Sequence, residues 1–91
     1  MFTIELTPDL SSCIETVARR EYNEATRTLL TDTSPDETIR EKAEILRLFL
    51  ETADFRKLRA ESEKHLLNGE KVKFLVSLDN ERLSYEMQIS R

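Results

Sequence analysis

The sequence predicts an α+β fold in which a three-stranded sheet is covered on one face by helices. The last twenty residues read as a β-hairpin whose apolar side chains alternate with polar ones, so the hairpin has one dry face. Most of the chain upstream of the hairpin has the spacing of amphipathic helices. Because a one-sided sheet must be covered, we expect one domain, residues 1–91, with the order β-α-α(-α)-β-β.

The N-terminal strand and the first helix are predicted from the spacing of apolar residues. Phe2, Ile4 and Leu6 alternate with polar neighbours, which predicts a third strand with the same dry face as the hairpin. Pro8 and Asp9 are then expected to open a helix. Its apolar stripe would comprise Leu10, Cys13, Ile14, Val17, Ala18, Tyr22, Ala25 and Leu29.

A second helix is predicted from a capping signature. Ser34 would be the N-cap, Pro35 the first helical residue and Glu37 the capping-box glutamate. The apolar stripe of this helix comprises Ile39, Ala43, Leu46, Leu50 and Ala53.

Beyond Ala53 the apolar residues point away from this stripe, so one straight helix could not face a single core. A break at residues 52–54 would solve this, with Asp54 or Thr52 capping a third helix that ends at Asn68 and Gly69. The alternative is one long helix whose distal half finds its core in another subunit.

The hairpin turn must contain an even number of residues, because both dry faces have to meet. We favour a two-residue loop, Asp79 and Asn80, over a four-residue loop. The two-residue loop predicts that Phe74 opposes Tyr85, Val76 opposes Leu83 and Lys73 opposes Glu86. The position of the first strand depends on the helix count, since two helices would return the chain antiparallel to that strand and three would return it parallel.

Composition and charge narrow the classes of function. The net charge of −4 argues against a general nucleic-acid binder, and no apolar run approaches the length of a membrane helix. The single cysteine, Cys13, cannot form an intramolecular disulfide, and the N-terminus lacks the pattern of a secretion signal. Cytoplasmic residence is therefore expected.

Residues that could carry chemistry are few. His65 follows Glu61 by four residues, but two potential ligands without a second histidine or a nearby cysteine do not make a metal site. Cys13 lies on an apolar stripe and is expected to be an inert core thiol. We therefore predict no catalytic residue, metal or cofactor, and no enzymatic activity.

A partner-binding segment is predicted from the change in the apolar stripe after Ala53, because the apolar residues beyond it have no assured partner in their own chain. Charge is also uneven: residues 1–55 carry −6 and residues 56–91 carry +2. We predict a homodimer, or binding of another protein, through residues 55–66 and neighbouring cations. The candidate residues are Phe55, Arg56, Lys57, Leu58, Arg59, Lys64, Leu66, Lys71 and Lys73.

These observations favour a small non-enzymatic protein-interaction, regulatory or adaptor protein. The alternative is a nucleic-acid-linked module, either a weak RNA or DNA binder or a degenerate RelE-like ribonuclease. The order of strand, helices and terminal strands, and the opening residues 1–8, resemble the start of RelE-type ribosome-dependent toxins. Those toxins are basic and expose tyrosine on their late strands, whereas this chain is acidic and the strand pattern turns Tyr85 inward. No catalytic residue is carried over from them.

Overall fold

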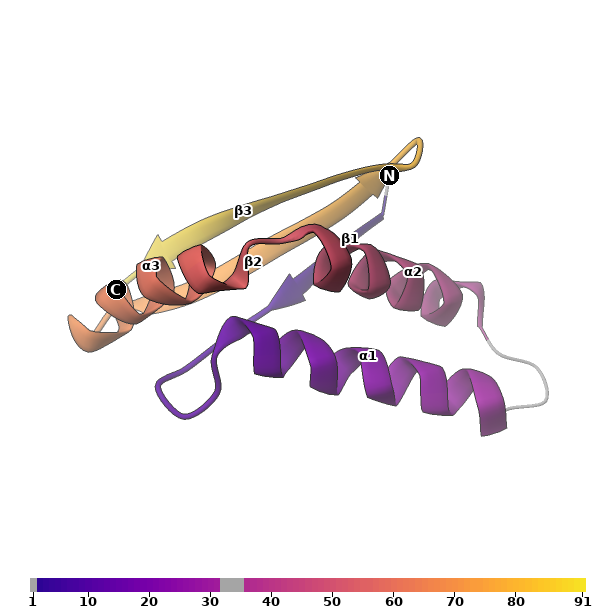
Figure 1. The fold of residues 1–91 in the computed structure, drawn as a ribbon, viewed down its shortest axis with the longest axis horizontal. Helices are drawn as coiled ribbons and strands as arrows, with labels where there is room; N and C mark the ends of the chain where they lie inside the picture. Colours follow the sequence, from indigo (N-terminus) through magenta and orange to yellow (C-terminus); the bar gives the residue numbers. More distant parts are fainter. Residues whose placement is uncertain (1, 32–35) are drawn as a thin grey trace.

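The computed structural model describes residues 2–31 and 36–91 and has the predicted α+β architecture (Figure 1). The elements are β1 (Phe2–Leu6), α1 (Ile14–Thr31), α2 (Glu37–Thr52), α3 (Phe55–Leu67), β2 (Lys71–Asp79) and β3 (Arg82–Ser90). The prediction of an N-terminal strand, helices and a C-terminal hairpin in one sheet is confirmed, with three helices.

The core lies between the sheet and the helices. The apolar side chains of β1 and β2 alternate inward and meet residues from all three helices. The buried cluster consists of Ile4, Leu6, Ile14, Ala18, Ile45, Leu46, Phe49, Leu58, Val72, Phe74 and Val76. The opposite face of the sheet carries the alternate, mostly polar residues, as expected for an antiparallel sheet with one dry face.

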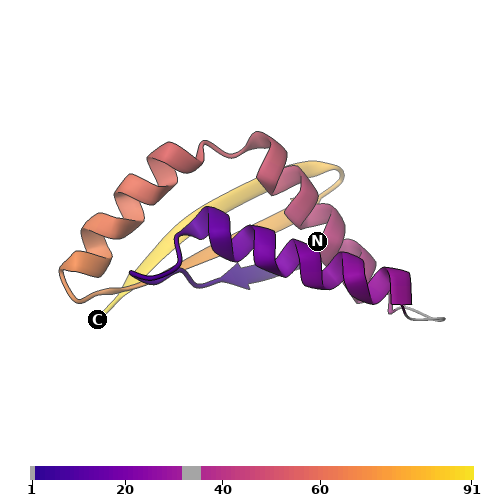
Figure 2. The same cartoon turned by 60° about the horizontal axis from the view of Figure 1, so that its bottom comes forward.

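The three strands are arranged in the order β1-β2-β3, and both neighbouring pairs are antiparallel. Our expectation that three helices would return the chain parallel to the first strand is wrong. In Figure 1, α3 continues in the direction of α2, and Figure 2 shows the two helices forming one arch over the sheet. Together they make one traverse of the sheet, so the chain returns antiparallel to β1.

Helix α1 begins later than predicted. Asp9 does not open the helix, because its side-chain oxygen accepts hydrogen bonds from the backbone N–H groups of Ser11 and Ser12, at 2.9 and 2.8 Å. These bonds hold residues 9–12 in a turn, so that α1 starts at Ile14. Leu10, which we placed on the helical stripe, is 65% exposed.

The predicted break between α2 and α3 is present at residues 53–54. Asp54 caps α3, and its side chain accepts a hydrogen bond from the N–H of Lys57. At the start of α2 the cap is Asp36, which accepts from the N–H of Thr38. Glu37 is therefore the first residue of α2 rather than its third, and the predicted cap at Ser34 and Pro35 lies outside the described residues.

The end of α3 is a Schellman motif, as its Asn-Gly sequence indicated. The N–H of Gly69 donates to the carbonyl of Leu66, and the N–H of Glu70 donates to the carbonyl of His65. Gly69 has φ of +79°, which a residue with a side chain adopts only at a cost. This motif turns the chain directly into β2.

The hairpin differs from the predicted register by two residues. The loop is Asn80 and Glu81, with Asp79 paired to Arg82. Both loop residues have positive φ, 49° for Asn80 and 65° for Glu81, as a type I′ turn requires. Asparagine is one of the residue types that adopt positive φ most readily.

The predicted cross-strand partners are consequently wrong. Phe74 opposes Met87, Val76 opposes Tyr85 and Lys73 opposes Gln88. A slip of two residues keeps every side chain on its face, so the alternating pattern could not distinguish the two registers. The observed register is that of the alternative four-residue loop, tightened because Asp79 and Arg82 also pair.

Candidate protein-interaction site

The helices cover the sheet unevenly and leave β3 partly uncovered. The inward side chains of the central strand β2, Val72, Phe74 and Val76, are 0–1% exposed. On β3 every residue is half-buried or exposed, including the inward-facing ones. Figure 1 shows β3 at the edge of the sheet farthest from α1. The helical layer is therefore displaced toward β1.

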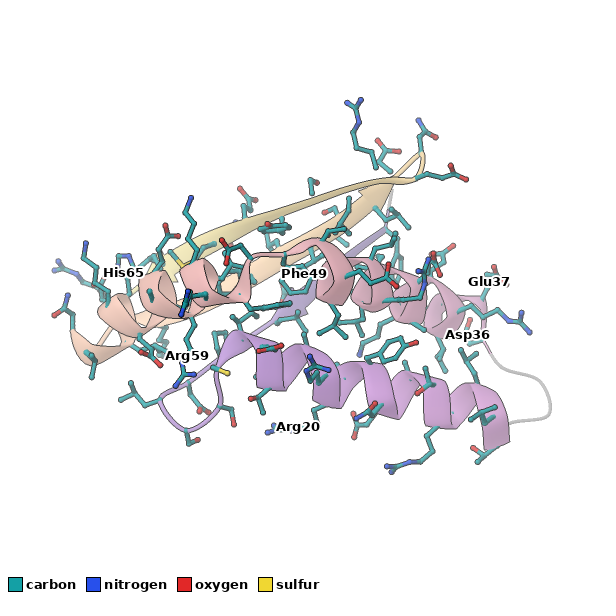
Figure 3. The ribbon with its side chains drawn as sticks, viewed as in Figure 1. Arg20, Asp36, Glu37, Phe49, Arg59 and His65 are labelled. Carbon is teal, nitrogen blue, oxygen red and sulfur yellow. The ribbon has the colours of Figure 1, made fainter. Side chains whose placement is uncertain are left out.

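An aromatic cluster positions the middle of β3 against the junction of α2 and α3. Phe49, which is fully buried, makes edge-to-face contacts with Phe55 and with Tyr85, each with ring centroids 5.2 Å apart. Figure 3 shows Phe49 between the helical layer and the sheet. Tyr85 thus packs on one side against the core, while 39% of its surface remains exposed.

A groove of about 260 Å³ runs between α3 and β3. Apolar and aromatic side chains form its floor, and charged side chains of α3 and β3 form its rim. It is lined by Asp54, Lys57, Leu58, Glu61, Phe74, Tyr85, Glu86 and Met87. A shallow apolar groove with a charged rim is typical of a surface that binds another protein chain.

Beside this groove lies the free edge of the sheet. β3 pairs with β2 on one side and with no other described strand on its opposite side. In an antiparallel pair, every second residue turns its backbone N–H and C=O away from the partner strand. Because Asp79 and Arg82 flank a two-residue loop as a bonded pair, the outward groups belong to Leu83, Tyr85, Met87 and Ile89. These four residues also carry the half-covered apolar side chains.

The edge has few features that would prevent pairing with another strand. β3 is nine residues long, regular, and contains no proline. Arg82 and Glu86 are its charged residues, and both have side chains on the outer face of the sheet. A long edge strand with apolar side chains on one face is expected to pair with another chain.

The apolar residues that we assigned to a partner-binding segment pack within their own chain. Leu58 is 9% exposed and belongs to the core cluster. Phe55 and Leu66 are half-buried and pack against the same cluster. The bend at residues 53–54 turns them back toward the sheet, so they do not by themselves require a second subunit.

The predicted cationic residues lie on two different faces. Arg56, Lys57, Arg59 and Lys64 are exposed on α3. Lys71 and Lys73 alternate with the buried residues of β2, so they lie on the opposite face of the sheet.

Two of these cations have acidic partners. Arg59 forms an ion pair of 2.9 Å with Glu63, and Lys73 lies 3.7 Å from Glu5. The cations of α3 and β2 therefore do not form one continuous positive surface. Partner binding by either group stays a prediction.

His65 lies in the last turn of α3, as expected, and is half-buried. His65 Nδ1 lies 3.2 Å from the carboxylate of Glu70, which the sequence did not suggest. Among the described residues, no group of three or more His, Cys, Asp or Glu side chains could hold a metal ion.

Cys13 is half-exposed at the start of α1 rather than within the core. Hydrogen bonds from the side chain and the backbone N–H of Thr16 lower the pKa of its thiol, with smaller contributions from the N–H of Glu15 and the charge of Arg59. Figure 3 shows Arg59 directed toward this end of α1. Our expectation that Cys13 is a core thiol is therefore wrong, because it assumed that Cys13 lies inside the helix on its apolar stripe.

The residues of β3 were missed as candidates because alternation predicts which face a side chain occupies, not whether that face is covered. The alternation of apolar and polar residues was the only ground for assigning four residues of β3 to the core, Leu83, Tyr85, Met87 and Ile89. The signal available in the sequence was the position of β3 as the last strand of a hairpin, which leaves it at an edge in the simplest sheet.

The fold and the groove define a small α+β protein with an uncovered edge strand. The model of a protein family of uncharacterised function matches residues 2–89, so the chain belongs to that family. Neither a curated protein nor a solved structure shows significant similarity to the chain. None of the helices in the described ranges is both long and apolar enough to cross a membrane.

Proposed function

We propose that this chain is a non-enzymatic protein-interaction protein, with a regulatory or adaptor role, that binds its partner through β3 and the groove between β3 and α3. The observation that carries the proposal is the combination of a free strand edge with half-covered apolar side chains on the same four residues. The partner would be a second copy of the chain or another protein.

The binding mode expected from this geometry is strand addition. Backbone groups along the free edge would supply hydrogen bonds, and the groove beside them would receive the side chains of the incoming strand. Tyr85 suits this role because its ring is held by Phe49 on one side and remains available on the other. Lys57 and Glu61 on the rim could add charge selectivity.

The alternative of a nucleic-acid-linked module has less support. The cations of α3 and β2 lie on opposite faces of the sheet, and Arg59 is paired with Glu63. Phosphate binding by several cations depends on a shared positive surface, so this division weakens the alternative. Cytoplasmic residence and the absence of enzymatic activity stay predictions.

Photocross-linking of this chain to its partner in living cells tests the proposal. A photoreactive phenylalanine analogue placed at position 85 should form covalent adducts with protein, because its ring would lie in the interface. The matched control places the same group at Gln88, which is exposed on the same strand but belongs to the outer face of the sheet. Adducts at position 85 that greatly exceed those at 88 are expected. Equal yields at the two positions, or no adducts at either, would refute the proposal.

A further inference from the structure

We infer that the partner at this site is a second copy of the chain, whose β3 pairs antiparallel with β3 of the first copy to form a continuous six-stranded sheet. This inference rests on the proposed function and names the occupant of its site. A twofold axis would pass through the sheet at Met87, so that each Met87 faces its counterpart.

The exposed area of the chain favours a stable assembly. The chain exposes 6295 Å², whereas a compact monomer of 10.7 kDa is expected to expose about 5,500 Å². The excess of roughly 800 Å² is of the size that one partner contributes to a stable protein–protein interface. The molecule is also elongated, with extents of 44 × 27 × 22 Å.

Side-chain pairing limits the possible registers. The two dry faces must lie on the same side of the joined sheet, so a twofold axis must place some β3 residue opposite itself. An axis at Glu86 would set two carboxylates against each other, which destabilises a strand pair. An axis at Met87 instead sets Glu86 opposite Gln88, and Tyr85 opposite Ile89, an aromatic and β-branched pair of the favourable kind.

An axis at Tyr85 also avoids like charges, and axes at Tyr85 and Met87 each pair seven residues of β3 with the other copy. Apart from Glu86, an axis at any other residue of β3 pairs five or fewer. The helices must therefore decide between Tyr85 and Met87. Phe55 and Tyr85 both contact Phe49, which places the start of α3 level with Tyr85. In Figure 1, α3 and β3 run in the same direction. Two strand residues advance about 6.6 Å, and about four helix residues advance the same distance. Met87 is therefore level with the middle of α3, between Lys57 and Glu61.

Charge complementarity on the groove rim then favours Met87. A twofold axis at this level makes the two α3 helices antiparallel and brings Lys57 of each copy opposite Glu61 of the other. The two β2 strands beneath them would be three strand spacings apart, about 14 Å, a gap that a lysine and a glutamate side chain can bridge together. Among the described residues, no ion pair within the chain joins Lys57 to Glu61. An axis at Tyr85 would instead bring the two Asp54 side chains near each other.

Disulfide scanning along β3 tests both the partner and the register. In a Cys13→Ser background, single cysteines are placed at positions 85, 86, 87 and 88, and covalent dimer is measured after mild oxidation. Only position 87 would face itself, with Cα atoms about 5.5 Å apart and within disulfide range. Position 85 would be displaced from its counterpart by four residues, about 14 Å along the strand. A sharp maximum at position 87 is expected, whereas a maximum at 85 or 86, or a flat profile, would overturn the inference.

Charge-swap variants provide a test that leaves β3 unchanged. Lys57→Glu should weaken the dimer several-fold in sedimentation equilibrium, and the double variant Lys57→Glu/Glu61→Lys should restore it. A failure to weaken or restore it would contradict the placement of the axis.

Sedimentation of the unaltered chain separates this inference from the proposed function. A monomer at tens of micromolar overturns the dimer. If position 85 still forms adducts with a different protein in cells, the proposed function stands without the dimer. If those adducts are also missing, both fail.

Discussion

At the scale of single residues, a few side chains decide where elements begin, end and turn. Asp9 ties the backbone of Ser11 and Ser12 and delays α1, whereas Asp54 caps α3 and fixes the bend. Gly69 supplies the positive φ that ends α3. These residues act through local hydrogen bonds and backbone conformation, and the sequence identifies those that follow known capping patterns.

Glu81 is predicted to be a point of backbone strain. It adopts φ of +65°, which costs a non-glycine residue about 1 kcal/mol or more. Glu81→Gly creates the preferred Asn-Gly pair and should raise the free energy of unfolding by roughly 0.5–1 kcal/mol. Urea denaturation measures the change. A destabilised variant would mean that Glu81 does not occupy the second position of a type I′ turn.

The Cys13 thiol is predicted to titrate below its usual range, chiefly through the Thr16 hydroxyl. Thr16→Val should raise the thiol pKa more than Arg59→Gln does, because the charge of Arg59 contributes least. Thiolate ultraviolet absorbance as a function of pH measures both shifts. An equal or larger effect of Arg59→Gln would contradict the assignment.

The same shift has a consequence for stability. When the folded-state pKa is lowered, the unfolded state binds more protons at pH values between the two pKa values. Stability from Cys13 is therefore fully present above the pKa of the unfolded thiol, about 8.5, and is lost as the pH falls through the folded-state pKa. Cys13→Ser should remove this pH dependence from urea denaturation curves.

At the scale of elements, the sequence predicts which helices and strands exist better than it predicts where they begin and end or how strands pair. The three strands, the α2–α3 break and the end of α3 followed from periodicity and capping residues. The hairpin register did not, because a two-residue slip leaves every side chain on its own face. The start of α1 was missed because the spacing of Leu10 and Cys13 continues the helical pattern into a turn that Asp9 holds.

The Asp54 cap is predicted to contribute about 1 kcal/mol to the free energy of unfolding. Asp54→Ala should lose this amount, whereas Asp54→Asn should retain most of it, because asparagine is an equally good cap. Chemical denaturation compares the two variants. Equal losses would indicate that the charge of Asp54 matters and its hydrogen bond to Lys57 does not.

At the scale of the whole molecule, the candidate site arises from the offset between two layers. The helices cover β1 and β2 and leave β3 at an open edge, which periodicity within single elements cannot reveal. The partner-binding site was therefore predicted on α3, where Leu58 is in fact buried in the core of its own chain. The predicted site and the observed groove have in common the part of α3 that faces β3.

Phe49 is predicted to hold the two layers in register, since its ring contacts both Phe55 and Tyr85. Phe49→Ala should cost about 3–5 kcal/mol of unfolding free energy, the usual range for removing a buried ring. Leu30→Ala is the matched control, because Leu30 is 87% exposed and its loss should cost well under 1 kcal/mol. Similar losses in the two variants would show that Phe49 is not central to the core.

The most direct measurement of the central claim is residue-resolved amide hydrogen exchange as a function of protein concentration. If β3 is the dimer edge, the outward amides of Tyr85, Met87 and Ile89 should become strongly protected as the concentration rises to tens of micromolar. The outward amides of β1, those of Thr3 and Glu5, should exchange at an unchanged rate, because the edge of β1 stays free. Protection on β1 instead of β3, or exchange on β3 that does not change with concentration, would contradict the account.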